Sequence, residues 1–368
     1  MPRTPHAAPT FWQSVWLVAT REIVARLRSK AFLISTGILL AVSLGSVIVG
    51  GLVGANATLP KVAVVGTASQ VVEKATGLDA VPTDSVEAAE ALVRDGTVSA
   101  AIVPAPVSPA SPLGIEVIAL DSPPTDVINA LSVYPEVTLL DPSPANGMLA
   151  YLVALGFGLV FFMSALTFGT TIAQSVVEEK QTRVVEILMS TIPVRALMAG
   201  KVLGNSILAF GQIVLIGVLV SAGMAVTGQR VLLGDLGPSI VWFAVFFAFG
   251  FVLLASLYAA TASMVSRQED VGTVTSPVMI LVMLPYLLVL FFYDNSTVLT
   301  IMSYIPFSAP VGMPMRIFLG TAEWWEPLLS LVILLVTTLL VIVLGARVYS
   351  NSLLRMGARV TLKEALRG

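Results

Sequence analysis

Six long windows without a charged residue constrain this chain more than any other feature of its sequence. Each is at least 20 residues long, and a helix needs about 20 apolar residues to cross the hydrocarbon core of a bilayer. Charged residues make up 11% of the chain, against about 25% in soluble proteins, which is too few to cover a soluble globule. We therefore expect an α-helical polytopic membrane protein with six transmembrane helices. The windows are Ala31–Gly54, Gly147–Ala173, Val202–Thr227, Leu236–Met264, Val271–Tyr293 and Pro327–Ala346.

The distribution of charge predicts the orientation of these helices. An even number of spans puts residues 1–30 and 347–368 on the same side of the membrane. That side also receives the loop at 174–201, and together with Arg267 it holds fifteen of the 20 lysines and arginines. Basic residues favour the cytoplasmic side, so we expect both termini in the cytoplasm of a bacterial or archaeal cell, with the remaining helices packed within residues 147–346.

Residues 55–146 differ in composition from the spans and predict a small α/β domain outside the cytoplasm, between the first and second helices. Lys61–Gly66, Ser99–Val103 and Gly114–Leu120 have the pattern of strands, and Ser85–Arg94 has the pattern of a helix with Ser85 as its N-cap. Strands that alternate with a helix favour an α/β layer. The domain has no histidine, cysteine or catalytic constellation, and its acidic residues are most simply read as solvated.

The segment before the first span, Phe11–Arg28, predicts an amphipathic elbow helix on the membrane surface. At 100° per residue, one face carries two tryptophans and three aliphatic residues, while Arg21 and Arg28 lie across from it. Tryptophan and arginine on such a helix suit the headgroup region, so membrane lipid is an expected partner. The alternative is a plain extension of the first span. The apolar face consists of Trp12, Trp16, Ala19, Ile23 and Leu27.

The loop at 174–201 predicts a helix, a break and a second helix. Its first part carries both signs of charge beside residues that can pack, and Thr191 and Pro193 interrupt the helical pattern. Such a helix can bind in a groove of a partner protein; the alternative is a solvated extension of the second span. The charged residues are Glu178, Glu179, Lys180, Arg183 and Glu186.

A second unusual loop lies between the last two spans, at residues 305–320. Pro306, Pro310 and Pro314 exclude one continuous helix, yet the stretch up to Arg316 is too apolar for a free aqueous loop. We expect short re-entrant or interfacial helices on the outer side, buried against the bundle.

Several chemistries are absent from the sequence. There is one histidine, no cysteine and no Walker motif, so the chain is expected to have no metal site, no catalytic residues and no ATP site of its own. The spans also lack the charged groups that ion-coupled carriers keep at membrane depth. Energy for transport would come from elsewhere, and no nucleic-acid partner or bound cofactor is expected.

The loop at 174–201 resembles that of type-2 ATP-binding-cassette (ABC) exporter permeases. It contains Glu-Glu-Lys at 178–180, Glu-Ile-Leu at 186–188, Thr-Ile-Pro at 191–193 and Gly-Lys at 200–201. The proline-rich stretch and the order of elbow helix, span, outer domain and five further spans are also similar to that family. The architecture is most similar to the subgroup with an outer domain after the first span, which includes sodium-extruding permeases.

This resemblance implies a permease subunit that pairs with a second permease subunit, identical or not, and with an ATPase subunit that binds ATP and Mg. Glu178, Glu179, Arg183 and Glu186 would then contact or couple to the ATPase. A membrane-anchored sensor or assembly factor that binds a ligand through the outer domain is the alternative. The substrate stays open among sodium, a lipid, a peptide and a drug, with uncharged spans favouring an amphiphilic cargo.

Overall fold

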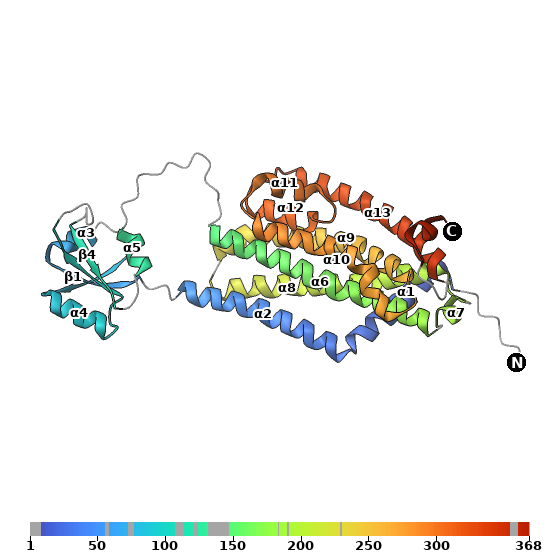
Figure 1. The fold of residues 1–368 in the computed structure, drawn as a ribbon, viewed down its shortest axis with the longest axis horizontal. Coiled ribbons are helices and arrows are strands. Elements are labelled where there is room, and N and C mark those ends of the chain that lie inside the picture. Colours follow the sequence, from blue (N-terminus) through green and yellow to red (C-terminus); the bar gives the residue numbers. More distant parts are fainter. Residues whose placement is uncertain are drawn as a thin grey trace, which may run out of the picture. The chain divides into compact units, whose positions relative to one another are not determined.

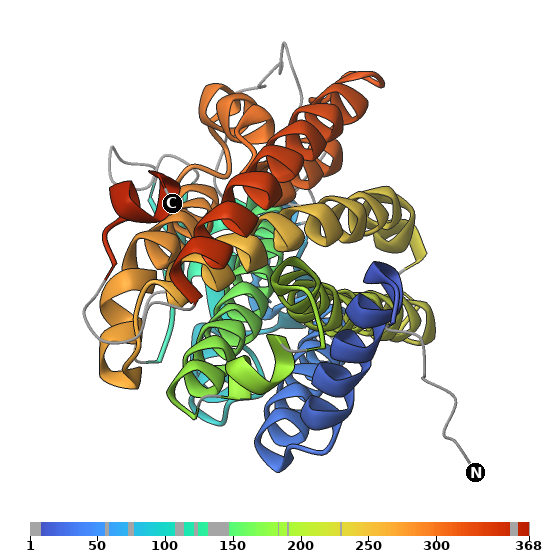
Figure 2. The same ribbon diagram turned by 90° about the vertical axis from the view of Figure 1, so that its right-hand side faces the viewer.

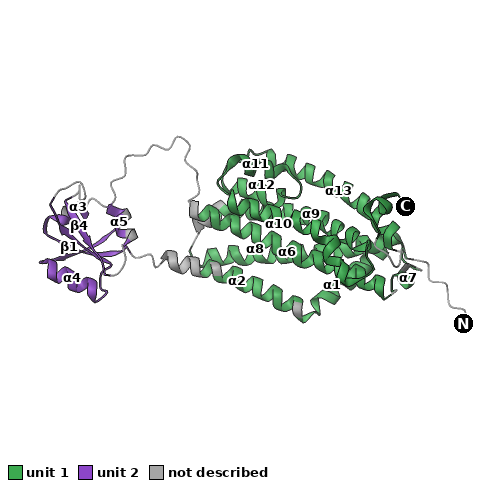
Figure 3. Ribbon diagram, viewed as in Figure 1, with its two compact units in different colours: residues 1–51, 143–368 green, residues 52–142 purple. Residues whose placement is uncertain are grey.

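The computed structural model describes residues 9–55, 59–72, 77–106, 114–120, 124–131, 147–182, 184–189, 191–228, 230–353 and 360–367. They form two compact units, shown in Figures 1 and 3. The helical unit combines Met1–Gly51 with Ser143–Gly368, and the α/β unit is Leu52–Pro142. We describe each unit by itself.

The helical unit is built from long apolar helices and several short ones, which Figure 2 shows along the bundle. Its helices are α1 (Phe11–Leu27), α2 (Lys30–Ala55), α6 (Gly147–Gln181), α7 (Val184–Met189), α8 (Val194–Val226), α9 (Arg230–Ser263), α10 (Val271–Phe291), α11 (Ser296–Tyr304), α12 (Ala309–Phe318), α13 (Glu326–Leu353) and α14 (Leu362–Arg367). A single 3₁₀ turn, Gln268–Asp270, separates α9 from α10.

Five of the described helices, α6, α8, α9, α10 and α13, are long and apolar enough to cross a membrane. A sixth candidate combines α1 with residues 32–45 of α2, and the two parts are bent by 70°. The polytopic helical architecture predicted from the charge-free windows is thus present. The bend follows the last turn of α1, where the polar residues Arg28 and Ser29 separate the two helices.

The core of the helical unit is organised around α9, which packs against α6, α8, α12 and α13. Aromatic rings join α6 to α9 along their length, because phenylalanines recur on the facing sides of both helices. Ring centroids lie 4.8 Å, 6.3 Å and 5.9 Å apart in the pairs Phe157–Phe243, Phe161–Phe247 and Phe168–Phe251. Close approach also depends on Gly169, where a Cβ would lie only 2.3 Å from the Tyr258 ring.

The α/β unit confirms the small domain predicted between the first two apolar helices. Its sheet has the order β2-β1-β3-β4, in which β1 (Lys61–Val65) pairs in parallel with β2 (Asp79–Thr83) and β3 (Ala100–Pro104), and β4 (Ile115–Ile118) is antiparallel to β3. Helix α4 (Val86–Arg94) packs on one face, and α3 (Ser69–Val72) and α5 (Thr125–Leu131) on the other.

Two details of this unit follow from local sequence. The Ser85 hydroxyl accepts a hydrogen bond from the Ala88 N–H at 3.2 Å and begins α4, as predicted for an N-cap. Strand β2 was not predicted from the sequence. It is a half-exposed edge strand that contains Pro82, so it lacks the pattern of a buried strand.

Candidate functional site

The helices around the loop predicted at 174–201 extend further than the sequence suggested. Residues 174–181 continue α6 and residues 194–201 begin α8, with α7 as a separate short helix between them. Both extensions remain helical because each has an apolar side that packs in the unit; Val176 and Val177 are fully buried, as is Leu197. Helix α7 and the turn at Thr191–Pro193 lie between these two long helices.

Helix α7 divides its side chains between the bundle and the exterior. Val185 is buried and Leu188 packs against the core, whereas Glu186 and Ile187 point outward, with Ile187 73% exposed. Glu178 is also exposed, and so is Pro193, which occupies the N-cap position of α8. Arg183 lies outside the described residues.

Two of the residues expected on the contact surface lie inside the unit instead. Glu179 and Lys180 are buried and bonded to other parts of the same chain. Their place in the last two turns of α6 explains this, because α1, α8, α9 and α13 close around that end of the helix. The charge pattern of the loop therefore contains two sets: Glu178 and Glu186 face outward, and Glu179 and Lys180 hold the helices together.

An ion-pair cluster surrounds the end of α6. The Lys201 ammonium of α8 lies 2.9 Å from Glu22 Oε1 of α1 and 3.0 Å from Glu179 Oε2 of α6, and it donates a hydrogen bond to Ser175 Oγ at 2.6 Å. Arg21 also bonds to Glu179 and lies 3.4 Å from Glu22. Two acids and two bases balance, so the cluster is neutral. It joins α6 and α8 to α1, which is far from both in sequence.

The seam between α1 and α8 passes beside this cluster. Val15, Val18 and Ala19 are buried at helical spacing on the side of α1 that faces α8. The backbones meet closely, since a Cβ on Gly200 would lie 2.8 Å from the Val15 carbonyl oxygen, and one on Gly204 would lie 2.8 Å from that of Ala19. Small residues four apart allow such contact between helices.

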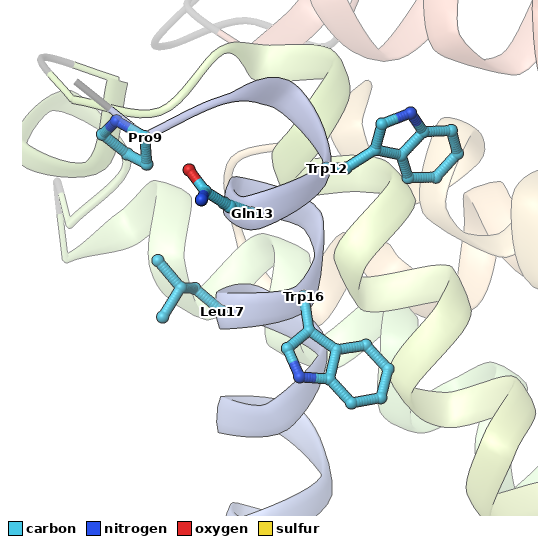
Figure 4. A pocket seen from close by; sticks show the side chains of 5 residues that line it. All are labelled: Pro9, Trp12, Gln13, Trp16 and Leu17. Carbon is cyan, nitrogen blue, oxygen red and sulfur yellow. The ribbon is translucent and has the colours of Figure 1, made fainter. Parts of the chain in front are cut away.

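The elbow helix α1 presents its tryptophans to the exterior, away from this seam. Trp12 is 75% and Trp16 56% exposed, and with Pro9, Gln13 and Leu17 they line a shallow hollow on the surface (Figure 4). Arg28 is exposed at the C-cap of α1. The predicted apolar face needs one correction, since Ala19 is buried against α8. The face of α1 that packs inward also includes Ser14 and Glu22, so it does not look apolar in the sequence.

The proline-rich hairpin predicted at 305–320 forms one short helix, α12, which packs mainly against α9 and also contacts α13, and the short helix α11, which precedes the hairpin, packs against α12. Pro306 lies between α11 and α12, Pro310 is in the first turn of α12, and Pro314 is inside α12. Arg316 is buried at the end of this hairpin, as expected for a stretch that packs on the bundle. The residues contacted by Arg316 come from α11, α13 and the segment between α12 and α13.

Arg316 forms a closed polar cluster. Its Nη2 lies 2.7 Å from Glu326 Oε2 and donates to the Thr321 carbonyl at 2.9 Å, and its Nη1 donates to Ser303 Oγ at 3.1 Å. The Tyr304 hydroxyl donates to Glu326 Oε1 at 2.7 Å. Burial and this bond to a carboxylate raise the pKa of Tyr304 above its usual value. These contacts connect α11 and α12 to α13, so the cluster fixes the hairpin to α13.

Comparison with known proteins identifies the family. The family model described as "ABC-2 family transporter protein" matches residues 30–347. The uncharacterized protein YhaP of Bacillus subtilis is 31% identical over 226 residues, covering 56% of this chain and 53% of YhaP. The uncharacterized protein MJ1024 of Methanocaldococcus jannaschii is 26% identical over 221 residues, 60% of this chain and 54% of MJ1024. The chain thus spans about half the length of these relatives. No solved structure matches.

The match to the family model includes the five helices that are long and apolar enough to span a membrane. The chain therefore belongs to the ABC-2 family of transporter proteins, the multi-pass membrane components of ABC transporters.

Proposed function

We propose that this chain is the permease subunit of an ATP-driven exporter, and that a separate ATPase contacts it at α7. The observation that carries this proposal is the outward face of α7. The side chains of Ile187 and Glu186 are exposed there, whereas Val185 on the same helix is buried. An apolar side chain bordered by acidic groups fits a groove on a partner protein. ATP and Mg would be bound by that partner.

The membrane topology is part of the same proposal. We place both termini and α7 in the cytoplasm and the α/β unit outside it, with α2 as the first of six spans and α1 as an elbow on the cytoplasmic surface. The support is the excess of basic residues on the proposed cytoplasmic side, together with the exposed tryptophans of α1, which suit contact with lipid headgroups.

Accessibility to a membrane-impermeant maleimide tests this topology, because the chain has no cysteine of its own. Asp84 and Arg195 are both exposed. We expect Asp84→Cys to react in intact cells and Arg195→Cys to react only after the membrane is opened. Reaction of both variants in intact cells would contradict the topology.

The cargo and the second subunit complete the proposal. The central parts of the spans lack ionisable residues, which favours an apolar or amphiphilic cargo over a bare cation. The resemblance to sodium-extruding permeases makes sodium the competing substrate. We propose that two permease subunits, identical or different, line the pathway. ATP hydrolysis by the reconstituted complex, measured against a panel of sodium, lipids, peptides and drugs, would separate these cargoes.

Reversing charge on α7 tests the contact with the ATPase. We expect Glu186→Lys, and more strongly Glu186→Lys combined with Ile187→Ser, to weaken co-purification of the ATPase by about tenfold, since a lost contact of 1.4 kcal/mol corresponds to that factor. The permease itself should still insert and purify. Glu87→Lys is the matched control, because Glu87 is equally exposed but belongs to α4 of the α/β unit.

Undiminished ATPase binding by the double variant would remove α7 from the interface. If wild-type chain purifies from its own cells with no ATP-hydrolysing protein, the exporter proposal fails, and a sensor that acts through the α/β unit becomes the better explanation.

A further inference from the structure

Lys180 is a fully buried lysine whose partners, among the described residues, are two main-chain carbonyls. Its Nζ donates to the carbonyl oxygen of Ser263 at 2.8 Å and to that of Ser352 at 2.9 Å. Ser263 is the last residue of α9, and Ser352 lies in the last turn of α13. Carbonyls at a helix C-terminus lack partners within their own helix and carry partial negative charge. A single ammonium from α6 therefore caps two other helices.

The residue before Lys180 makes a separate set of contacts. Successive residues of a helix point about 100° apart, so Glu179 faces the cluster of Lys201 and Arg21, which belong to α8 and α1. Two neighbouring residues of α6 thus connect it to four helices. Glu179 connects it through charged side chains, whereas Lys180 connects it through backbone and so follows the position of α9 and α13 directly.

Glu179 and Lys180, which make these contacts, come shortly before α7 in the chain. Helix α7 begins four residues after Lys180, with Thr182 as the described residue between α6 and that short helix. On the other side, the C-terminal helix α14 is attached to the same ends of α9 and α13. The Val360 N–H donates to the Met264 carbonyl at 3.0 Å, and the Asn351 amide donates to the Ala365 carbonyl at 2.8 Å. Lys180 therefore lies on a hydrogen-bonded path from α6 to the helix ends that hold α14.

From these contacts we infer that Lys180 is a positioning residue, which makes the ends of α9 and α13 follow α6 when the ATPase moves α7. The inference rests on the proposed function for the source of the movement. The mechanical connection through Lys180 lies within this chain and does not depend on the proposed function. A lysine that only filled space would be replaceable by an isosteric apolar residue without loss of the linked movement.

Spin-label distances test the inference, since cysteines can be introduced into a chain that has none. The label pair Gln174–Trp324 follows α6, and the pair Leu362–Trp324 follows α14; all three positions are exposed. In the purified complex with its ATPase, we expect trapping with ADP and vanadate to shift both distances. In Lys180→Met the first shift should persist and the second should fall to less than half. Lys180→Arg should restore the shift of the Leu362–Trp324 distance. Lys30→Met, at an exposed lysine of α2, should change neither of the two shifts.

The isolated permease provides a second measurement that needs no ATPase. The Gln174–Leu362 distance distribution should be narrow in the wild type, about twice as broad in Lys180→Met, and narrow again in Lys180→Arg. Should Lys180→Met not fold, Lys180→Gln, which keeps one donor, takes its place. Equal widths in wild type and variant, or equal shifts on trapping, would overturn the inference. Absence of any ATPase would overturn the proposed function only, and the width measurement would still decide the role of Lys180.

Discussion

Replacing Lys201 with methionine is expected to lower the free energy of unfolding by about 3–5 kcal/mol, because it leaves buried carboxylates without their shared partner. Lys201 is completely buried and lies within 3.0 Å of an oxygen of both Glu22 and Glu179. After the change, the remaining ion pairs of these two acids among the described residues are those with Arg21, whose side chain is half exposed. Reversible unfolding in mixed micelles measures the change.

The double variant Lys201→Met with Glu22→Gln separates the ion pairs from packing. It removes one buried negative charge together with the positive one, so it should recover a large part of the lost stability. Lys30→Met is the control at an exposed lysine on α2 and should be nearly neutral. If Lys201→Met proves as mild as Lys30→Met, the cluster does not hold α1, α6 and α8 together.

Adding a side chain at Gly200 should separate α1 from α8. In Gly200→Val the new Cβ would lie 2.5 Å from Val18 Cβ, and overpacking of this kind costs about 1–3 kcal/mol. The cost falls on the contact with α1, so we expect local opening of the elbow helix. Ser14→Cys, a nearly isosteric change at a buried position of α1, should then react with a maleimide about tenfold faster, the factor given by 1.4 kcal/mol.

Gly211→Val is the matched control for this experiment. Gly211 is also in α8, but nothing lies within 4 Å of its Cβ position. The same substitution there should leave the reaction rate of Ser14→Cys unchanged. Equal acceleration by both valines would mean that the effect arises from α8 as a whole and not from its seam with α1.

The sequence predicted the helices much better than the contacts between them. The charge-free windows located the apolar helices because exclusion of charge from lipid acts on each segment separately. A helix, a break and a second helix were predicted at residues 174–201 and are present, but the packing of residues 174–181 and 194–201 inside the unit was not predicted, because their charges are neutralised by distant parts of the chain. Lys201 and Glu22 are 179 residues apart, and no local pattern connects them.

The seam of the elbow helix was hidden for a related reason. Trp12 and Trp16 were predicted on the face toward lipid and are exposed in the unit, but the sequence did not show that the polar Ser14 and Glu22 lie on the buried face. One signal for the seam was present in the sequence. Gly200 and Gly204 are four residues apart at the start of an apolar helix, a spacing typical of close helix pairs. It indicates where another helix packs, although not which one.

Helix α6 has a mechanical consequence of its own. It is one uninterrupted element of 35 residues, about 52 Å long at 1.5 Å per residue, whereas the hydrocarbon core measures about 30 Å. A rigid rod of that length amplifies small rotations: tilting it by about 10° about one end moves the other end by about 9 Å. If the proposed ATPase moves the end of α6 near α7, a small rotation there would thus be transmitted along the whole helix, because α6 has no break that would absorb it.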